Sequence, residues 1–215
     1  ITLSALQIPI FKVNGQLLDC AGQAVANGYV KITLGDSKYF LHAEANGQFE
    51  FAMVGCGSTA QTGEATGYDL ANLLESAPTP LSTPPNSINL GTLTVCTALT
   101  EYIQYTLDGQ TFTKISPFGV LDATSTFIAS EDSTQNNAYI QFNFENNGQT
   151  GTFPLRFLQV NQLFYDISFG TVLTTDVTTY GNVGDLITGS FSGTFQQFSN
   201  GASHTISCNY RVIRE

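Results

Sequence analysis

The 215-residue sequence is poor in charged side chains, which make up 11% of it, against about 25% in ordinary soluble domains. Long helices need Glu, Lys and Arg on their solvated face, so this shortage argues against a mainly helical protein. The seven basic residues are outnumbered by seventeen acidic ones, and the net charge of −10 would repel a phosphate backbone. We therefore expect no nucleic-acid partner. No run of 18 apolar residues occurs, so we also expect no transmembrane segment.

Residues that commonly carry chemistry are also scarce. There are two histidines, no C-x-x-C pair, and no G-x-S-x-G or phosphate-binding glycine motif in a suitable context. We therefore expect a protein that is not an enzyme and has no metal and no cofactor. The four cysteines permit three disulfide connectivities, and their spacing does not choose among Cys20, Cys56, Cys96 and Cys208. Cys208 alternates with apolar residues of the last expected strand, which predicts a buried free thiol.

The dominant pattern is alternation of apolar and polar residues, interrupted by Asn-Gly and Asp-Gly pairs. Val30, Ile32 and Leu34 share one face of an expected strand. Turn pairs occur at Asn46-Gly47, Asp108-Gly109, Asn147-Gly148 and Asn200-Gly201. The first pair is expected to join residues 39–44 to residues 48–53 through a type I′ turn. The sequence thus predicts an all-β protein of two antiparallel β-sandwich domains in series, at residues 1–98 and 99–215.

Two segments depart from simple alternation. Residues 68–75 could form one or two helical turns, and the prolines after them predict a long crossing loop before a strand resumes at Ile88. In residues 187–195 one face carries Ile, Phe and glycine, and the other carries only Thr and Ser. We expect Gly189 and Gly193 to make room for Phe rings of the opposing sheet.

Residues 13–25, followed by Gly28-Tyr29-Val30 and by Asn46-Gly47-Gln48-Phe49, resemble the carboxypeptidase regulatory-like, transthyretin-like domain. Ala24 stands where that family usually has proline. The resemblance covers about residues 8–96. It implies a small prealbumin-like β-sandwich that docks, spaces or presents other modules and has no catalytic residues of its own.

Residues 101–215 are similar to a β-rich domain of unknown function in surface lipoproteins of the Bacteroides group, through residues 107–112, 151–153, 184–195 and 210–212. This resemblance implies an exported bacterial protein, at the cell surface (outer membrane) or in the periplasm, in some cases linked to adhesion. The sequence contains no lipobox cysteine at its start, so a lipid anchor would have to be attached upstream of Ile1.

Acidic and histidine side chains offer weaker candidates for a site. His42 and Glu44 would share a strand face, which we interpret as a solvated face in preference to a metal site. Calcium binding by loop carboxylates is left open, at Asp19, Asp69, Glu131 and Asp132. A carboxylate-based hydrolase would need two acids, for example Glu131, Asp132 or Asp185, to meet in one pocket.

Tyrosines are the remaining candidates, because they often populate recognition surfaces. The possible ligand contacts are Tyr102, Tyr105, Tyr139, Tyr165 and Tyr180. The leading interpretation is a non-catalytic surface protein with a structural, adhesion or ligand-presenting role, whose partner is a protein or a glycan. A carbohydrate-binding component of a glycan-uptake system and a carboxylate-based hydrolase are the alternatives.

Overall fold

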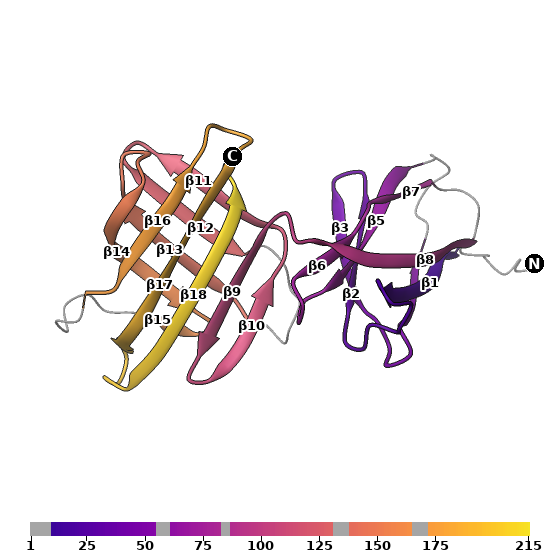
Figure 1. The fold of residues 1–215 in the computed structure, drawn as a ribbon, viewed down its shortest axis with the longest axis horizontal. Helices are drawn as coiled ribbons and strands as arrows, with labels where there is room; N and C mark the ends of the chain where they lie inside the picture. Colours follow the sequence, from indigo (N-terminus) through magenta and orange to yellow (C-terminus); the bar gives the residue numbers. More distant parts are fainter. Residues whose placement is uncertain (1–9, 55–60, 83–86, 131–137, 165–171) are drawn as a thin grey trace, which may run out of the picture. The chain divides into compact units, whose positions relative to one another are not determined.

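A computed structural model of the chain describes residues 10–54, 61–82, 87–130, 138–164 and 172–215 (Figure 1). Within these ranges every regular element is a β-strand, which confirms the predicted all-β class with two β domains. The chain divides into two compact units, Ile1–Leu99 and Thr100–Glu215. Cys56, Glu131, Asp132 and Tyr165 lie outside the described residues.

The first unit is built on an eight-stranded sheet with the order β3-β2-β5-β6-β8-β1-β4, in which β7 pairs with β5. Its strands are β1 (Ile10–Asp19), β2 (Tyr29–Leu34), β3 (Ser37–His42), β4 (Gln48–Val54), β5 (Thr62–Asp69), β6 (Leu74–Ser76), β7 (Thr79–Ser82) and β8 (Ser87–Ala98). β1 and β8 run parallel, while the other pairs are antiparallel. The predicted sheet is therefore mostly, but not wholly, antiparallel.

Alternation places the core of the first unit as the sequence predicts. Val30 and Ile32 are fully buried and Leu34 is 2% exposed, and they join a cluster that includes Val13 and Leu17 of β1. Burying such aliphatic side chains contributes roughly 1.5–3 kcal/mol each, so this cluster is a major source of stability in the first unit.

Two local predictions in this unit are wrong. Asn46-Gly47 does form a turn, with Gly47 at φ +77°, but Asn46 does not adopt the positive φ that a type I′ turn needs. β3 pairs with β2 and β4 with β1, so the turn passes the chain to a different strand instead of closing a hairpin. The short strands β6 and β7 take the place of the expected helical turns and long loop. β7 contains Pro80, which is tolerated because β7 pairs with β5 alone and is not a central strand of the sheet.

The second unit is a ten-stranded antiparallel sheet with the order β10-β9-β18-β17-β16-β14-β13-β12-β11, and β15 pairs with β14. Its strands are β9 (Tyr102–Leu107), β10 (Gln110–Lys114), β11 (Pro117–Asp122), β12 (Ser125–Ser130), β13 (Ile140–Glu145), β14 (Gly151–Val160), β15 (Leu163–Phe164), β16 (Thr174–Tyr180), β17 (Leu186–Gln196) and β18 (Ser203–Ile213). Gly119 of β11 forms a bridge with Arg214, just after β18, and its carbonyl accepts a hydrogen bond from the Glu215 amide at 2.8 Å. This bridge is parallel, and the sheet thus curls so that β11 at one end meets the end of β18, the third strand from its other end.

Three hairpins of this unit follow the predicted turns. Asp108 (φ +48°) and Gly109 (φ +86°) both adopt left-handed backbone and join β9 to β10 with the register of a two-residue turn. Asn147 and Gly148 likewise lie between β13 and β14, and Asn200-Gly201 lies between β17 and β18. These pairings confirm hairpins at the three pairs.

Aromatic rings fill the core of the second unit. Phe142 is fully buried and contacts Phe191 and Tyr210 at ring-centroid distances of 5.0 and 5.2 Å. Cys208 is a buried free thiol, as predicted, and burial raises its pKa. We expected Gly189 to make room for a Phe ring of the opposing sheet, and this prediction is wrong. The side chain closest to a Cβ at this position would be Tyr210 of the adjacent strand.

Candidate binding surfaces

The structure separates the candidate tyrosines. On β9 the side chains alternate, so that Tyr105 faces the core and Tyr102 faces outward. Tyr105 is 1% exposed, its ring stacks on Phe112, and its hydroxyl donates to Asn161 Oδ1 at 2.9 Å. A ligand at the surface cannot reach it, which corrects its choice as a contact residue.

The other described tyrosines do not converge on one site. Tyr139 is half-buried, donates to Gln141 Oε1 at 2.6 Å, and has its pKa raised by burial. The hydroxyls of Tyr180 and Thr126 are hydrogen-bonded at 2.7 Å, while the Arg214 guanidinium lies 5.2 Å from the Tyr180 ring centroid. Tyr180 packs against the core cluster, whereas Tyr102 is on the outward side of β9, opposite Arg211.

The described loop carboxylates are occupied by their own turns. Asp19 Oδ1 accepts from the amides of Ala21 and Gln23, both at 2.8 Å. Asp69 Oδ1 accepts from the Ala71 and Asn72 amides at 3.1 Å. His42 packs edge-on against Tyr29. Across the described ranges, no three His, Cys, Asp or Glu side chains lie together as metal ligands would, and no helix is long and apolar enough to cross a membrane.

A polar surface of different character covers the outer side of β9, β10, β16, β17 and β18. We call it the hydroxyl face, and it is made mostly of serine and threonine. None of its side chains is buried. Its members are Gln104, Thr106, Thr111, Thr174, Asp176, Thr178, Thr188, Ser190, Ser192, Thr194, Thr205, Ser207, Asn209 and Arg211.

Strand pairing arranges these side chains in rows across the sheet. Ser190 lies opposite both Asp176 and Asn209, and Asn209 lies opposite Gln104. A second row runs from Ser192 through Ser207 to Thr106. Since paired strands are about 4.8 Å apart and alternate residues about 6.7 Å apart, the face presents a regular grid of hydroxyl groups.

The grid is hollowed near its centre. A hollow of about 320 Å³ lies here, over the buried residues Phe191 and Cys208. The polar residues that line it are Thr174, Asp176, Ser190, Ser192, Ser207 and Asn209. Small side chains on adjacent strands leave this space open. A ligand lying here could form hydrogen bonds with groups from β16, β17 and β18 at once.

The charged members of the hydroxyl face are already engaged. Asp176 Oδ1 accepts from Thr152 Oγ1 at 3.3 Å, and Arg211 Nε donates to the Thr100 carbonyl at 2.9 Å. The remaining members are uncharged hydroxyls and amides. Because the charges of Asp176 and Arg211 are opposite in sign, the face has no formal net charge and is suited to an uncharged partner.

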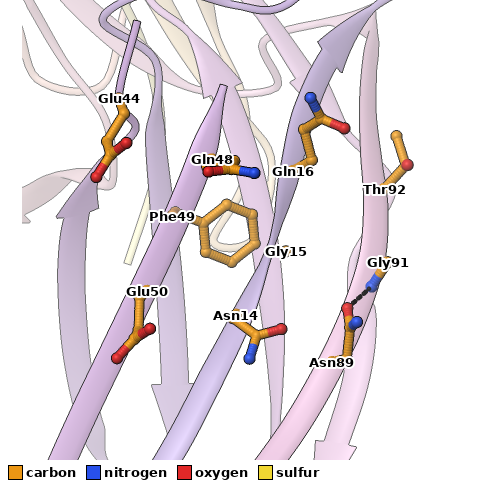
Figure 2. A pocket seen from close by; sticks show the side chains of 10 residues that line it. All are labelled: Asn14, Gly15, Gln16, Glu44, Gln48, Phe49, Glu50, Asn89, Gly91 and Thr92. Atoms are coloured by element: carbon orange, nitrogen blue, oxygen red, sulfur yellow. Dashed lines mark hydrogen bonds between the residues drawn. The ribbon is translucent and has the colours of Figure 1, made fainter. Parts of the chain in front are cut away.

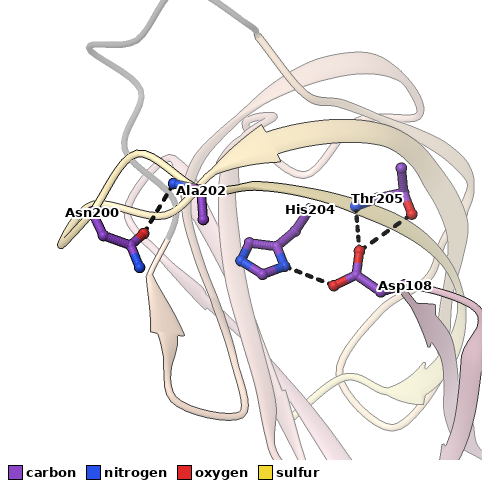
Figure 3. A network of polar contacts seen from close by, with 5 residues as sticks. All are labelled: Asp108, Asn200, Ala202, His204 and Thr205. Carbon is purple, nitrogen blue, oxygen red and sulfur yellow. Dashed lines mark hydrogen bonds and ion pairs between the residues drawn. The ribbon is translucent and has the colours of Figure 1, made fainter.

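One end of the hydroxyl face is held by a network around Asp108 (Figure 3). Asp108 Oδ1 accepts from the Thr205 amide at 2.8 Å, and Oδ2 lies 2.7 Å from His204 Nδ1. The hydrogen bonds from His204 and from the Thr205 backbone lower the pKa of Asp108. Figure 3 also shows the Asn200 side chain accepting from the Ala202 amide within the β17–β18 turn. The turn before β10 is thus fastened to the first residues of β18.

Sequence reasoning detected only part of this surface. The run Thr188, Ser190, Ser192, Thr194 is visible in the sequence as one face of a strand. Its continuation onto β16, β18 and β9 depends on which strands lie beside it. Period-two patterning does not supply that order.

Comparisons with known proteins add little. No family model matches the chain, and no curated protein matches it. Among solved structures it is similar to a DUF3823 family protein from Bacteroides ovatus, at 7% sequence identity and a TM-score of 0.27, over 95% of this chain and 99% of that one. A TM-score of this size establishes no shared fold, and no functional argument follows from it. Neither the carboxypeptidase regulatory-like resemblance nor the resemblance of the second half has a matching family model.

Proposed function

We propose that this protein is a non-catalytic binding protein of the bacterial cell surface or periplasm, and that its hydroxyl face holds a neutral polysaccharide. The hydroxyl face is the observation that carries the proposal. Each serine or threonine hydroxyl can donate and accept, so the grid complements a ligand that is itself covered with hydroxyls. This proposal combines two interpretations of the sequence, a ligand-presenting surface protein and a carbohydrate-binding component of a glycan-uptake system.

The proposed compartment has support from the cysteines. Cys20, directly after β1, forms a disulfide with Cys96 of β8, across 76 residues of sequence. Structural disulfides form and persist in oxidising environments such as the periplasm and the cell surface. This bond supports export. A lipid anchor and a role in adhesion remain separate proposals.

The test is binding of soluble neutral polysaccharides, namely a β-glucan, a xylan and a mannan, measured by affinity electrophoresis and calorimetry. We expect at least one of them to bind. The triple variant Ser192→Ala/Ser207→Ala/Asn209→Ala should weaken that binding about tenfold or more, because each lost hydrogen bond contributes roughly 0.5–1.5 kcal/mol.

Ser199→Ala is the matched control, because Ser199 is exposed in the β17–β18 turn and outside the hydroxyl face. It should bind as the unchanged protein does. Equal affinity of the triple variant and the control would contradict the proposed site, and failure to bind any of the three polysaccharides would contradict the proposed function.

A further inference from the structure

A polar groove lies on the first unit, over the adjacent strands β4, β1 and β8 (Figure 2). Its volume is about 500 Å³, and it is unrelated to the hydroxyl face, which belongs to the second unit. Amides and carboxylates dominate its lining, through Asn14, Gln16, Glu44, Gln48, Glu50 and Asn89.

A β-bulge in the parallel pair of β1 and β8 shapes the groove. Asn14 pairs with Asn89 and Gln16 with Thr92, so Gly15 lies opposite two residues of β8. The second of these is Gly91, with φ +66°, and its amide donates to Asn89 Oδ1 at 2.8 Å (Figure 2). The Asn89 side chain therefore fixes the bulge.

Glycine is required where the strands meet in this groove. A Cβ on Gly15 would lie 2.6 Å from Phe49 Cζ and 2.9 Å from the Gly91 carbonyl oxygen, which leaves no room for a side chain. A Cβ on Gly91 would meet nothing within 4 Å. The space next to Gly91, at the bulge, is thus open.

The walls of the groove carry negative charge. Glu44 and Glu50 line it, and the described residues that line it include no lysine or arginine. The cation of Lys12 lies 3.2 Å from Glu50 Oε1, with both side chains about half exposed (50% and 59%). Such exposed pairs are weak, so a positively charged ligand can compete for Glu50.

We propose that this groove binds an oligosaccharide of amino sugars, in which ammonium groups face Glu44 and Glu50 and hydroxyls face the amides. A peptide cannot bind in the groove as an additional strand beside β1, because β1 is already paired with β4 on one side and with β8 on the other. Phe49 is 4% exposed, so the groove offers no aromatic anchor for an apolar side chain. Charge and hydrogen bonding remain as the means of recognition.

The experiment compares two ligands of equal length, the β-1,4-linked glucosamine hexamer and its fully N-acetylated form, by titration calorimetry. It uses the full chain carrying Ser192→Ala/Ser207→Ala/Asn209→Ala, so that binding at the hydroxyl face is weakened equally in every measurement. We expect the glucosamine hexamer to bind more tightly than the acetylated one, with an affinity that falls as salt is added.

Glu44→Gln/Glu50→Gln should weaken binding of the glucosamine hexamer about tenfold, because each of the two lost charge pairs contributes roughly two- to fivefold in affinity. Glu64→Gln/Glu215→Gln changes the net charge equally outside the groove and should have no effect. Asn14→Ala, which alters no charge, should weaken binding roughly two- to fivefold through a lost hydrogen bond.

Three outcomes would overturn the assignment. They are equal binding of the two hexamers, equal losses in both glutamate double variants, and equally tight binding of a lysine hexapeptide, which would reduce the effect to plain charge attraction. Because every measurement is made with the same weakened hydroxyl face, these comparisons report on the groove and leave the proposed function of the second unit to its own test.

Discussion

Tyr210 shows how closely single residues are matched in the second unit. Its ring packs against Phe142 in the core, and its hydroxyl is hydrogen-bonded to Thr175 Oγ1 at 2.9 Å. Burial raises the pKa of Tyr210, so the hydroxyl stays protonated throughout the physiological range. The ring has room because its cross-strand neighbour is Gly189.

Replacing Gly189 by alanine should therefore destabilise the second unit. The new Cβ would lie 2.3 Å from the Tyr210 hydroxyl and 2.5 Å from the Asp176 carbonyl oxygen, and the backbone oxygen cannot give way easily. We expect Gly189→Ala to lower the free energy of unfolding by about 1–3 kcal/mol, measured by urea unfolding. Ser190→Ala, one residue along the same strand, should change it by less than about 0.5 kcal/mol. Equal stability of Gly189→Ala and the unchanged protein would show that the close packing drawn here is wrong.

At the scale of strands and turns, local chemistry predicted some pairings and missed others. Asp108-Gly109 closes a hairpin because both residues tolerate positive φ and the strands on either side alternate in register. Asn46-Gly47 is a turn pair of the same kind, but the strand that follows it, β4, pairs with β1. There its Phe49 joins the core cluster that contains Val13 and Leu17 of β1. The parallel pairing of β1 and β8 joins segments about 75 residues apart, and no local pattern reports such a contact.

The Asp108 network links a turn to a strand, and its strength should depend on pH. The pKa of Asp108 is lower in the folded protein than the value of about 3.9 expected when unfolded, so its contribution is complete above that value and is lost as pH falls below it. Asp108→Asn should lower the melting temperature at pH 6 by less than about 4 °C, because the side chain is half exposed.

The difference between Asp108→Asn and the unchanged protein should shrink between pH 4 and pH 2, as followed by circular dichroism melts. Asp122→Asn is the control, since Asp122 is exposed at the end of β11 and takes no part in the network. A difference that stays constant down to pH 2 would show that the carboxylate charge contributes nothing.

For the molecule as a whole, the sequence predicted the class of fold better than the places where ligands could bind. Alternation and turn residues are local, and they specify strands and cores such as Val30, Ile32 and Leu34. Both candidate binding surfaces are instead products of sheet order. The hydroxyl face needs β16, β17, β18 and β9 side by side, and the groove needs the β1–β8 bulge. The tyrosine content did not predict either surface, because tyrosines such as Tyr105 and Tyr210 are buried in the core.

The disulfide belongs to the first unit alone, which predicts a separable response of the two units to reduction. Cys20 and Cys96 both lie in Ile1–Leu99, whereas Cys208 of the second unit is free and buried. Opening a link across 76 residues releases entropy in the unfolded chain, and such a loss usually costs about 2–4 kcal/mol. We therefore expect two calorimetric transitions, of which a reductant lowers one by roughly 10 °C and leaves the other in place.

Two variants assign those transitions. Cys20→Ser/Cys96→Ser should melt like the reduced protein and respond no further to reductant, which separates this bond from any effect at the other cysteines. Gly189→Ala should lower only the transition that reductant leaves in place, because Gly189 lies in the second unit. If one substitution moved both transitions together, the units would unfold as a single cooperative body. The disulfide would then stabilise the hydroxyl face as well as the fold that carries the groove.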